Sequence, residues 1–218
     1  MPLKATVDPD AARSLSTAMR VGSQAAHDAA ERSLFVQELM DGKLNEQGYA
    51  DYLSRLRMVY AALEAAVRSH RDDALVASVY DPSLERLPAI EADLEFWAGG
   101  AAPAVDSAAA RAYCDRIAAA SGSALLAHHY TRYLGDLSGG QAIGRVLDRT
   151  FELDGAGLSF YQFPMRPKPY KDAYRARLDE LGLAPDEVER VVDEVKLAFR
   201  LNQNLFDELA ENLMSYYR

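Results

Sequence analysis

The sequence predicts an all-α protein, and three observations support this prediction. Apolar residues recur at intervals of three and four over most of the chain, which is the spacing that gives a helix one buried face. The two-residue alternation of β-branched and polar side chains that is typical of strands is scarce. Alanine, the strongest helix former, is abundant. The chain has 218 residues, of which 49% are hydrophobic and 26% charged. We therefore expect one helical domain over residues 1–218, with about residues 1–9 as a flexible N-terminal tail.

Three helices are expected in the N-terminal part of the chain. The first covers residues 10–31, and the second covers residues 33–42 and ends at Gly42. The third covers residues 45–70 and carries one continuous apolar stripe. The stripe consists of Tyr49, Tyr52, Leu53, Leu56, Val59, Tyr60, Leu63 and Val67.

Prolines and glycines delimit the elements of the middle of the chain. Asp81-Pro82 is typical of an N-cap followed by proline at the first helical position, so we expect a helix from there to Trp97. Glycines at 99–100 end it, and Pro103 opens another helix that ends near residues 121–122.

The last third of the chain begins with an unusual helix. Residues 124–151 are helical by composition but contain several glycines, and residues 155–169 form the best candidate for a long loop. A short helix is expected over residues 170–181, and Pro185 opens the last one. The apolar stripe of that last helix is Val188, Val191, Val192, Val195, Phe199, Asn202, Leu205, Phe206, Leu209 and Leu213.

The composition excludes several classes of function. Acidic residues number 33 and basic residues 24, a formal charge of −9, which argues against a general nucleic-acid binder. The one cysteine, Cys114, allows neither an internal disulfide nor a cysteine-based metal cage, and it favours a reducing, cytoplasmic location. No apolar run approaches the roughly 20 residues of a membrane span, so we expect no membrane anchor.

Glycines interrupt the helical segment at 124–151 in a way that costs free energy. Gly135, Gly139 and Gly140 together cost about 3 kcal/mol relative to alanine if they lie within a helix. Such a cost is typical of a kink, or of a surface without side chains where a ligand lies against backbone. Gly135 and Gly139 are four residues apart and so share one helix face. The alternative interpretation is two helices joined by a turn at Gly139 and Gly140.

This glycine-rich segment carries a resemblance to a known family. Residues 129–141 read HYTRYLGDLSGGQ, and this run closely resembles the distal helix of heme oxygenases. Further segments match in the family's order and at about its spacing. They are residues 24–35, 59–64, 93–97, 126–145, 171–177 and 198–209. The His128-His129 pair and a C-terminus without a hydrophobic tail look most like the soluble bacterial members.

The resemblance implies a fold and a reaction. Heme would be sandwiched between a proximal helix and a glycine-kinked distal helix of a helical bundle. The reaction would be oxidative cleavage of heme to biliverdin with O₂, releasing ferrous iron and carbon monoxide, in heme degradation and iron acquisition. The chain has no flavin or nicotinamide motif, so electrons would come from an external donor, a ferredoxin or a flavoprotein reductase.

Heme degradation needs one protein ligand to the iron, and a neutral imidazole suits that role. The resemblance places the proximal ligand at His27, with Glu31 one helical turn later as the partner that orients its ring. From the spacing alone, the pair is more typical of a surface His–Glu contact. His128 and His129 are adjacent, point about 100° apart and cannot share a metal, so they are expected to pack or to join a polar network. His70 ends a helix and is expected to be solvated.

On the opposite side of the heme, the resemblance assigns the catalytic role to Asp136. There the aspartate orders water above the iron and helps to deliver protons to bound O₂. Arg132 and Tyr60 fit the same polar network. The alternative for Arg132 and Asp136 is a surface ion pair. The surrounding glycines argue against it, as does the order of the two residues, since arginine before aspartate is the less favourable orientation on a helix.

The remaining candidates surround the heme. Lys171 and Arg175 match family positions that hold the propionates, as does Arg20, and these matching cations make the α meso carbon the expected point of attack. Tyr130 matches a residue close to the heme, and Gly135 and Gly139 would leave room for it. Aromatic residues that match the pocket lining are Phe199 and Phe206, although core packing explains both equally well.

Two other functions remain open from the sequence. A heme carrier or sensor would bind heme without turnover, and it would have no need of an acid such as Asp136. A thiamin-hydrolysing all-α enzyme of similar architecture would need a cysteine nucleophile with a partner. Cys114 matches no functional residue of the heme oxygenases and is expected to be structural.

Overall fold

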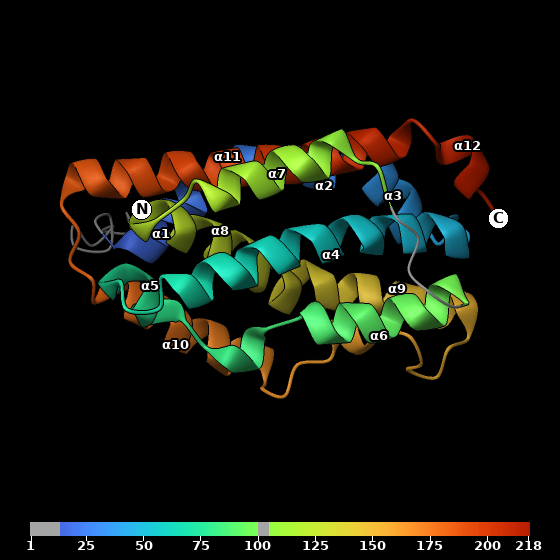
Figure 1. Ribbon diagram of the computed structural model, residues 1–218, viewed down its shortest axis with the longest axis horizontal. Coiled ribbons are helices and arrows are strands. Elements are labelled where there is room, and N and C mark those ends of the chain that lie inside the picture. Colours follow the sequence, from blue (N-terminus) through green and yellow to red (C-terminus); the bar gives the residue numbers. More distant parts are fainter. Residues whose placement is uncertain (1–13, 100–104) are drawn as a thin grey trace, which may run out of the picture.

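The computed structural model describes residues 14–99 and 105–218, and all regular structure in these two ranges is helical (Figure 1). A single isolated bridge pairs Leu44 with Tyr217. The tail expected at about residues 1–9, residues 10–13 of the first expected helix, Gly100 and the helix start expected at Pro103 lie outside the described residues. In the described part, no helix combines the length and the apolar character needed to cross a bilayer.

The helices follow one another with short connections. In chain order they are α1 (Leu15–Gly22), α2 (Gln24–Glu31), α3 (Leu34–Met40), α4 (Glu46–Ser69), α5 (Ala74–Val79), the 3₁₀ turn η2 (Pro82–Leu84), α6 (Leu87–Ala98), α7 (Ala108–Ala118), α8 (Gly122–Gly135), the π-turn η3 (Asp136–Gly140), α9 (Gln141–Phe151), the 3₁₀ turn η4 (Ser159–Tyr161), α10 (Pro167–Asp179), α11 (Pro185–Ala210) and α12 (Leu213–Tyr216).

Two long helices organise the bundle. Figure 1 shows α4 and α11 extending along the length of the molecule, with α7 packed against both. Helix α6 packs along α4, and α8 packs along α11. The apolar stripe expected on the helix at residues 45–70 is buried over its full length, because it faces α6 and α7.

The first expected helix is in fact two helices. The break lies at Ser23, where the Met19 carbonyl accepts both the backbone N–H of Ser23 at 3.2 Å and its hydroxyl at 2.7 Å. Beside it, Gly22 lies against Val192 of α11, where a Cβ would come within 2.5 Å of the valine. The break separates α1 from α2, and both helices then contribute side chains to one cavity.

Several boundaries differ from the expected ones because side-chain caps override the periodicity. Helix α5 was not expected, and Asp73 caps it by accepting from two backbone N–H groups. Asp81-Pro82 begins only the short turn η2, so α6 starts later, at Leu87. Helix α7 starts at Ala108, capped by Ser107.

The glycine-rich helix does not break. Helix α8, the π-turn η3 and α9 form one continuous helical path, and Gly140 has helical angles of φ −54° and ψ −38°. The alternative of two helices joined by a turn at residues 139–140 is therefore wrong. The expected loop at 155–169 contains η4, and α10 begins three residues before the expected start at 170.

Candidate functional site

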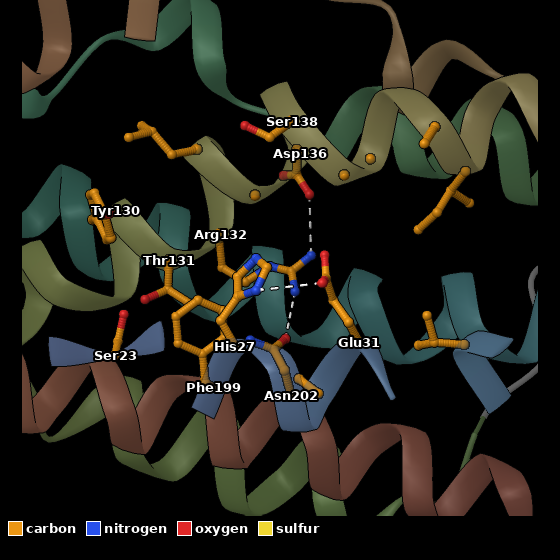
Figure 2. A pocket seen from close by; sticks show the side chains of 18 of the residues that line it. Ser23, His27, Glu31, Tyr130, Thr131, Arg132, Asp136, Ser138, Phe199 and Asn202 are labelled. Carbon is orange, nitrogen blue, oxygen red and sulfur yellow. Dashed lines mark hydrogen bonds and ion pairs between the residues drawn. The ribbon is translucent and has the colours of Figure 1, made fainter. Parts of the chain in front are cut away.

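A cavity of about 560 Å³ lies between the N-terminal helices and the glycine-rich helix. Helices α1 and α2 form one wall, and α8, η3 and α9 form the opposite wall. Side chains of α11 and η4 complete the lining. Figure 2 shows His27 pointing into this space from α2 and Asp136 pointing into it from the opposite wall.

His27 has a defined orientation in this cavity. Its Nδ1 lies 3.6 Å from a carboxylate oxygen of Glu31, and the edge of its ring meets Phe199 at a centroid distance of 5.3 Å. Nδ1 is buried, which leaves Nε2 as the nitrogen available to a ligand. The His27 side chain is 42% exposed, so the histidine is neither a plain surface residue nor a buried one. A carboxylate beside Nδ1 is the usual arrangement behind a metal-binding imidazole.

Asp136 belongs to a buried polar network on the opposite wall. Its carboxylate accepts a hydrogen bond from the Tyr60 hydroxyl and lies 3.4 Å from the Arg132 guanidinium. Arg132 also donates to the Tyr60 hydroxyl at 3.1 and 3.2 Å and to the side-chain oxygen of Asn202. The Arg132 and Asp136 side chains are 8% and 7% exposed, so the interpretation as a surface ion pair is wrong.

Burial and charge set the protonation of this network. Burial raises the pKa of Asp136, and the nearby Arg132 opposes that rise. Burial acts to lower the pKa of Arg132, but Tyr60 and Asp136 outweigh it and raise that pKa above its usual value. The guanidinium therefore stays charged, and the carboxyl holds its proton more tightly than an exposed aspartate does.

The glycines of this wall fall into two groups. A Cβ placed on Gly135 or Gly139 would meet nothing within 4 Å, so packing within the described residues does not account for glycine there. By contrast, a Cβ on Gly144 would lie 3.1 Å from the Tyr161 ring. Because Gly135 and Gly139 line the cavity, they leave a surface of bare backbone on which a flat ligand can lie.

Cations lie at the edge of the cavity. Arg20 and Arg175 line it, and Arg175 also lies 3.3 Å from Asp172. Lys171 is not part of the lining. Its ammonium donates at 2.7 Å to the hydroxyl of Ser138, and Ser138 does line the cavity.

Aromatic side chains complete the lining. Tyr130, Phe199 and Phe206 all contribute to it. Both phenylalanines are half-buried, because each packs against core residues on one side and lines this space on the other. The cavity thus has an imidazole on one wall and a buried acid on the other, with a bare glycine surface and cations at the edge. These features fit a flat, apolar, dicarboxylate ligand that carries a metal.

Comparison with known proteins agrees with this geometry. The sequence model of the heme oxygenase family, described as "Heme oxygenase", matches residues 13–208. The chain belongs to the heme oxygenase family. Heme oxygenase 1 of Synechocystis sp. is 35% identical to it over 207 residues, which span 92% of this chain and 86% of that protein.

Solved structures support the same assignment. The crystal structure of heme oxygenase-1 from Synechocystis in complex with heme matches with a TM-score of 0.87 at 34% identity, covering 93% of this chain and 95% of that one. The structure of heme oxygenase from Leptospira interrogans matches with a TM-score of 0.83 at 36% identity, covering 89% and 99% of the two chains.

The remaining histidines lie away from the heme oxygenase cavity lining. His128 bonds to Glu194 at 2.9 Å, and His129 bonds to the Tyr174 hydroxyl at 2.8 Å, so both join polar networks as expected. His70 is half-buried and its Nδ1 lies 2.9 Å from the Ala66 carbonyl, rather than being simply solvated.

Cys114 does not contribute to the cavity. It is half-buried on α7 and is not among the residues that line this space. The structure therefore offers no cysteine nucleophile for a thiamin-hydrolysing enzyme at this cavity.

Some cavity residues were not singled out from the sequence. Tyr52 and Asn202 were assigned to apolar core stripes, yet both line the cavity. Asn202 carried a usable signal, because an amide within an apolar stripe requires a buried partner, and that partner is Arg132. Ser23 and Thr131 carried no such signal.

Proposed function

We propose that this chain binds heme between α2 and η3 and cleaves it to biliverdin, with release of ferrous iron and carbon monoxide. The observation that carries the proposal is the buried Asp136–Tyr60–Arg132 network facing His27 across one cavity. A carrier needs the imidazole and the apolar walls, whereas a buried acid with a raised pKa that lines the same cavity opposite the imidazole suits proton transfer.

His27 is proposed to ligate the iron through Nε2, and Glu31 to orient the ring from Nδ1. The edge of Phe199 limits rotation of the same ring. On the opposite wall, Gly135 and Gly139 present backbone without side chains, so these two positions would supply no second ligand to the iron of a bound heme.

Heme, when bound, supplies the iron at which O₂ is activated. Asp136 is proposed to hold and to pass protons on that side of the cavity, directly or through water. Tyr60 and Arg132 fix its carboxyl, and the charge of Arg132 limits the rise in the pKa of Asp136. Asn202 holds Arg132 in turn. These three side chains keep the proposed proton donor in one position.

The propionates are proposed to meet Arg20, Lys171 and Arg175, with Tyr130 beside the heme. Their positions would fix the rotation of heme and direct attack to the α meso carbon. Alanine at both Lys171 and Arg175 should then change the isomer ratio of the bilin product, because each charged contact is worth only about 0.2–1 kcal/mol and rotations differ by small amounts.

The reaction also consumes O₂ and electrons. An external donor, a ferredoxin or a flavoprotein reductase, is proposed, since the sequence has no flavin or nicotinamide motif. The single cysteine supports a reducing compartment, and we place the reaction in the cytoplasm, in heme degradation and iron acquisition. Residues 1–218 are proposed to act as one domain.

The test is to add hemin, then a reductase system in air, and to record the absorption spectrum through time. We expect the heme band to decay as a biliverdin band rises, with one carbon monoxide released per heme. Tight hemin binding without any bilin, in the presence of a donor shown to reduce the bound heme, would favour the carrier instead.

A further inference from the structure

Gln141 directly follows the π-turn, and its side chain reaches back across it. The Nε2 atom donates to the carbonyl of Asp136 at 3.2 Å and to the carbonyl of Tyr161 at 2.9 Å. Its two hydrogens thus join the first residue of η3 to the last residue of η4. Both segments line the cavity, from different parts of the chain.

Other contacts of the π-turn hold Leu137, which is buried in the core, and Ser138, whose hydroxyl accepts from Lys171 of α10 at 2.7 Å. A Cβ at Gly139 would touch nothing within 4 Å, so packing does not constrain the cavity side. Tyr60 and Arg132 hold the carboxyl of Asp136, but not its peptide group. A π-turn replaces the i→i+4 hydrogen bonds of an α-helix with i→i+5 bonds, and each carbonyl oxygen can accept a further hydrogen bond from a side-chain donor. Gln141 supplies one at Asp136.

The segment η4, to which Gln141 connects the π-turn, is held by other contacts. Asp93 of α6 accepts hydrogen bonds from the backbone N–H groups of Ser159 and Phe160 at 2.8 and 2.7 Å, which anchors η4. The ring of Tyr161 packs closely over Gly144, where a Cβ would come within 3.1 Å. Gln141 therefore connects the π-turn to a segment that is fixed on two sides.

We propose that Gln141 is a positioning residue of the distal wall, which anchors the π-turn to η4 and thereby holds the Asp136 carboxyl in place over the heme. This inference rests on the proposed function of Asp136. The amide offers two N–H donors to two carbonyl oxygens, so a carboxylate of the same shape would face both oxygens without a donor. Methionine, of similar length, removes both bonds without adding charge.

The test compares Gln141→Glu and Gln141→Met with a matched control, Gln162→Glu. Gln162 is exposed, lies one residue beyond Tyr161 and caps the Gly155 carbonyl at 3.3 Å, away from the cavity lining. The first readout is hydrogen exchange in the heme-free protein. We expect amides of residues 136–141 to exchange about tenfold faster in both Gln141 variants, as loss of a stabilising hydrogen bond predicts, and at the wild-type rate in the control.

The second readout is the yield of biliverdin and of hydrogen peroxide per O₂ consumed by the heme-loaded enzyme. We expect both Gln141 variants to bind heme as the wild type does but to release more peroxide and less biliverdin, Gln141→Glu most strongly. A structural role alone would lower thermal stability without changing this ratio.

Several results would overturn the inference. Hydrogen exchange and product yields equal to the wild type in both Gln141 variants would do so. Changes of the same size in Gln162→Glu would do so as well. Loss of folding in both would also contradict it, because Gln141 would then hold the whole fold. If the wild type itself made no biliverdin, the proposed function would fail, while the exchange rates would still decide whether Gln141 anchors the turn.

Discussion

His27 and Asp136 are distant in the sequence yet point into one cavity from opposite walls (Figure 2). The ring of His27 lies beside Phe199, and its Nδ1 is 3.6 Å from a Glu31 carboxylate oxygen, so both neighbours limit the space in which the ring can turn. Asp136 is likewise held by Tyr60 and Arg132. The neighbours of these two side chains therefore favour the positions that the proposed roles require.

Replacing His27 with alanine should remove the protein ligand to the iron while leaving the fold intact, because the side chain is half-exposed. We expect a hemin complex with a changed absorption spectrum and no turnover. Added imidazole should partly restore the wild-type spectrum and the turnover. The spectrum and the bilin yield are measured with and without imidazole. An unchanged spectrum and unchanged turnover would move the ligand assignment to another residue.

For single residues, the sequence predicts which side chains share a helix face better than it predicts what surrounds them. The spacing of His27 and Glu31 predicts that they share a helix face, but only the resemblance predicts a ligand role. Asp136 and Arg132 have the spacing of an ordinary surface pair, and their burial depends on Tyr60 and Asn202 from α4 and α11. Such long-range contacts have no local signature in the chain.

The π-turn is the element on which the distal wall depends. It lies within a continuous helix, and its glycines serve two different purposes. Gly139 is open toward the cavity, whereas Gly144, in the helix that follows, receives the Tyr161 ring. The periodicity of the sequence indicated helix through this region, and the glycines indicated a departure from it, but neither distinguished a π-turn from a break.

Alanine at these two glycines should have opposite effects on stability. Gly139→Ala should raise the free energy of unfolding of the heme-free protein by about 0.5–1 kcal/mol, because alanine favours helix and its Cβ meets no atom. Gly144→Ala should lower it by about 1 kcal/mol or more, through the clash with Tyr161. Urea denaturation measures both.

Hemin titration of the same variants separates stability from binding. Gly139→Ala should weaken hemin binding despite its greater stability, because the new methyl group enters the cavity. If its affinity matched that of the wild type, the bare glycine surface would not be part of the heme site.

For the other elements, the apolar stripes on the two long helices were predicted well because burial follows periodicity. The breaks were predicted less well. The division at Ser23 coincides with a side-chain hydrogen bond to Met19, and α5 begins at the Asp73 cap. Both are features of single residues, which periodicity averages out.

Across the whole molecule, several titrating groups are buried and make stability depend on pH. Burial lowers the pKa of His129 to about 3, far below the value of about 6.5 in an unfolded chain. Burial acts to raise the pKa of Glu194, but hydrogen bonds from His128 and Arg116 outweigh it and lower that pKa to about 2. The unfolded chain binds more protons at both sites, so each of these two groups destabilises the fold as the pH falls.

The two groups act in different pH ranges. His129 should lower the free energy of unfolding by about 1.4 kcal/mol per pH unit as pH falls from about 6.5 toward 3. Glu194 lowers the free energy of unfolding further below about pH 4.5. His129→Gln removes the first contribution while keeping a polar partner for Tyr174, so its stability should be flatter between pH 6.5 and 5. Urea denaturation at several pH values measures the slope, and equal slopes in both proteins would contradict this account.

The most direct measurement of the central claim is the yield of biliverdin per heme for the wild type, Asp136→Ala and Asp136→Asn under one electron donor. All three should bind hemin, since His27 and the apolar walls supply most of the affinity. We expect a high bilin yield from the wild type and little from Asp136→Ala, with peroxide released in its place. Asp136→Asn should give an intermediate biliverdin yield, because an amide can hold a water but cannot pass on a proton as a carboxyl does. Equal yields from all three proteins would contradict the assignment of Asp136 as the group that directs heme cleavage.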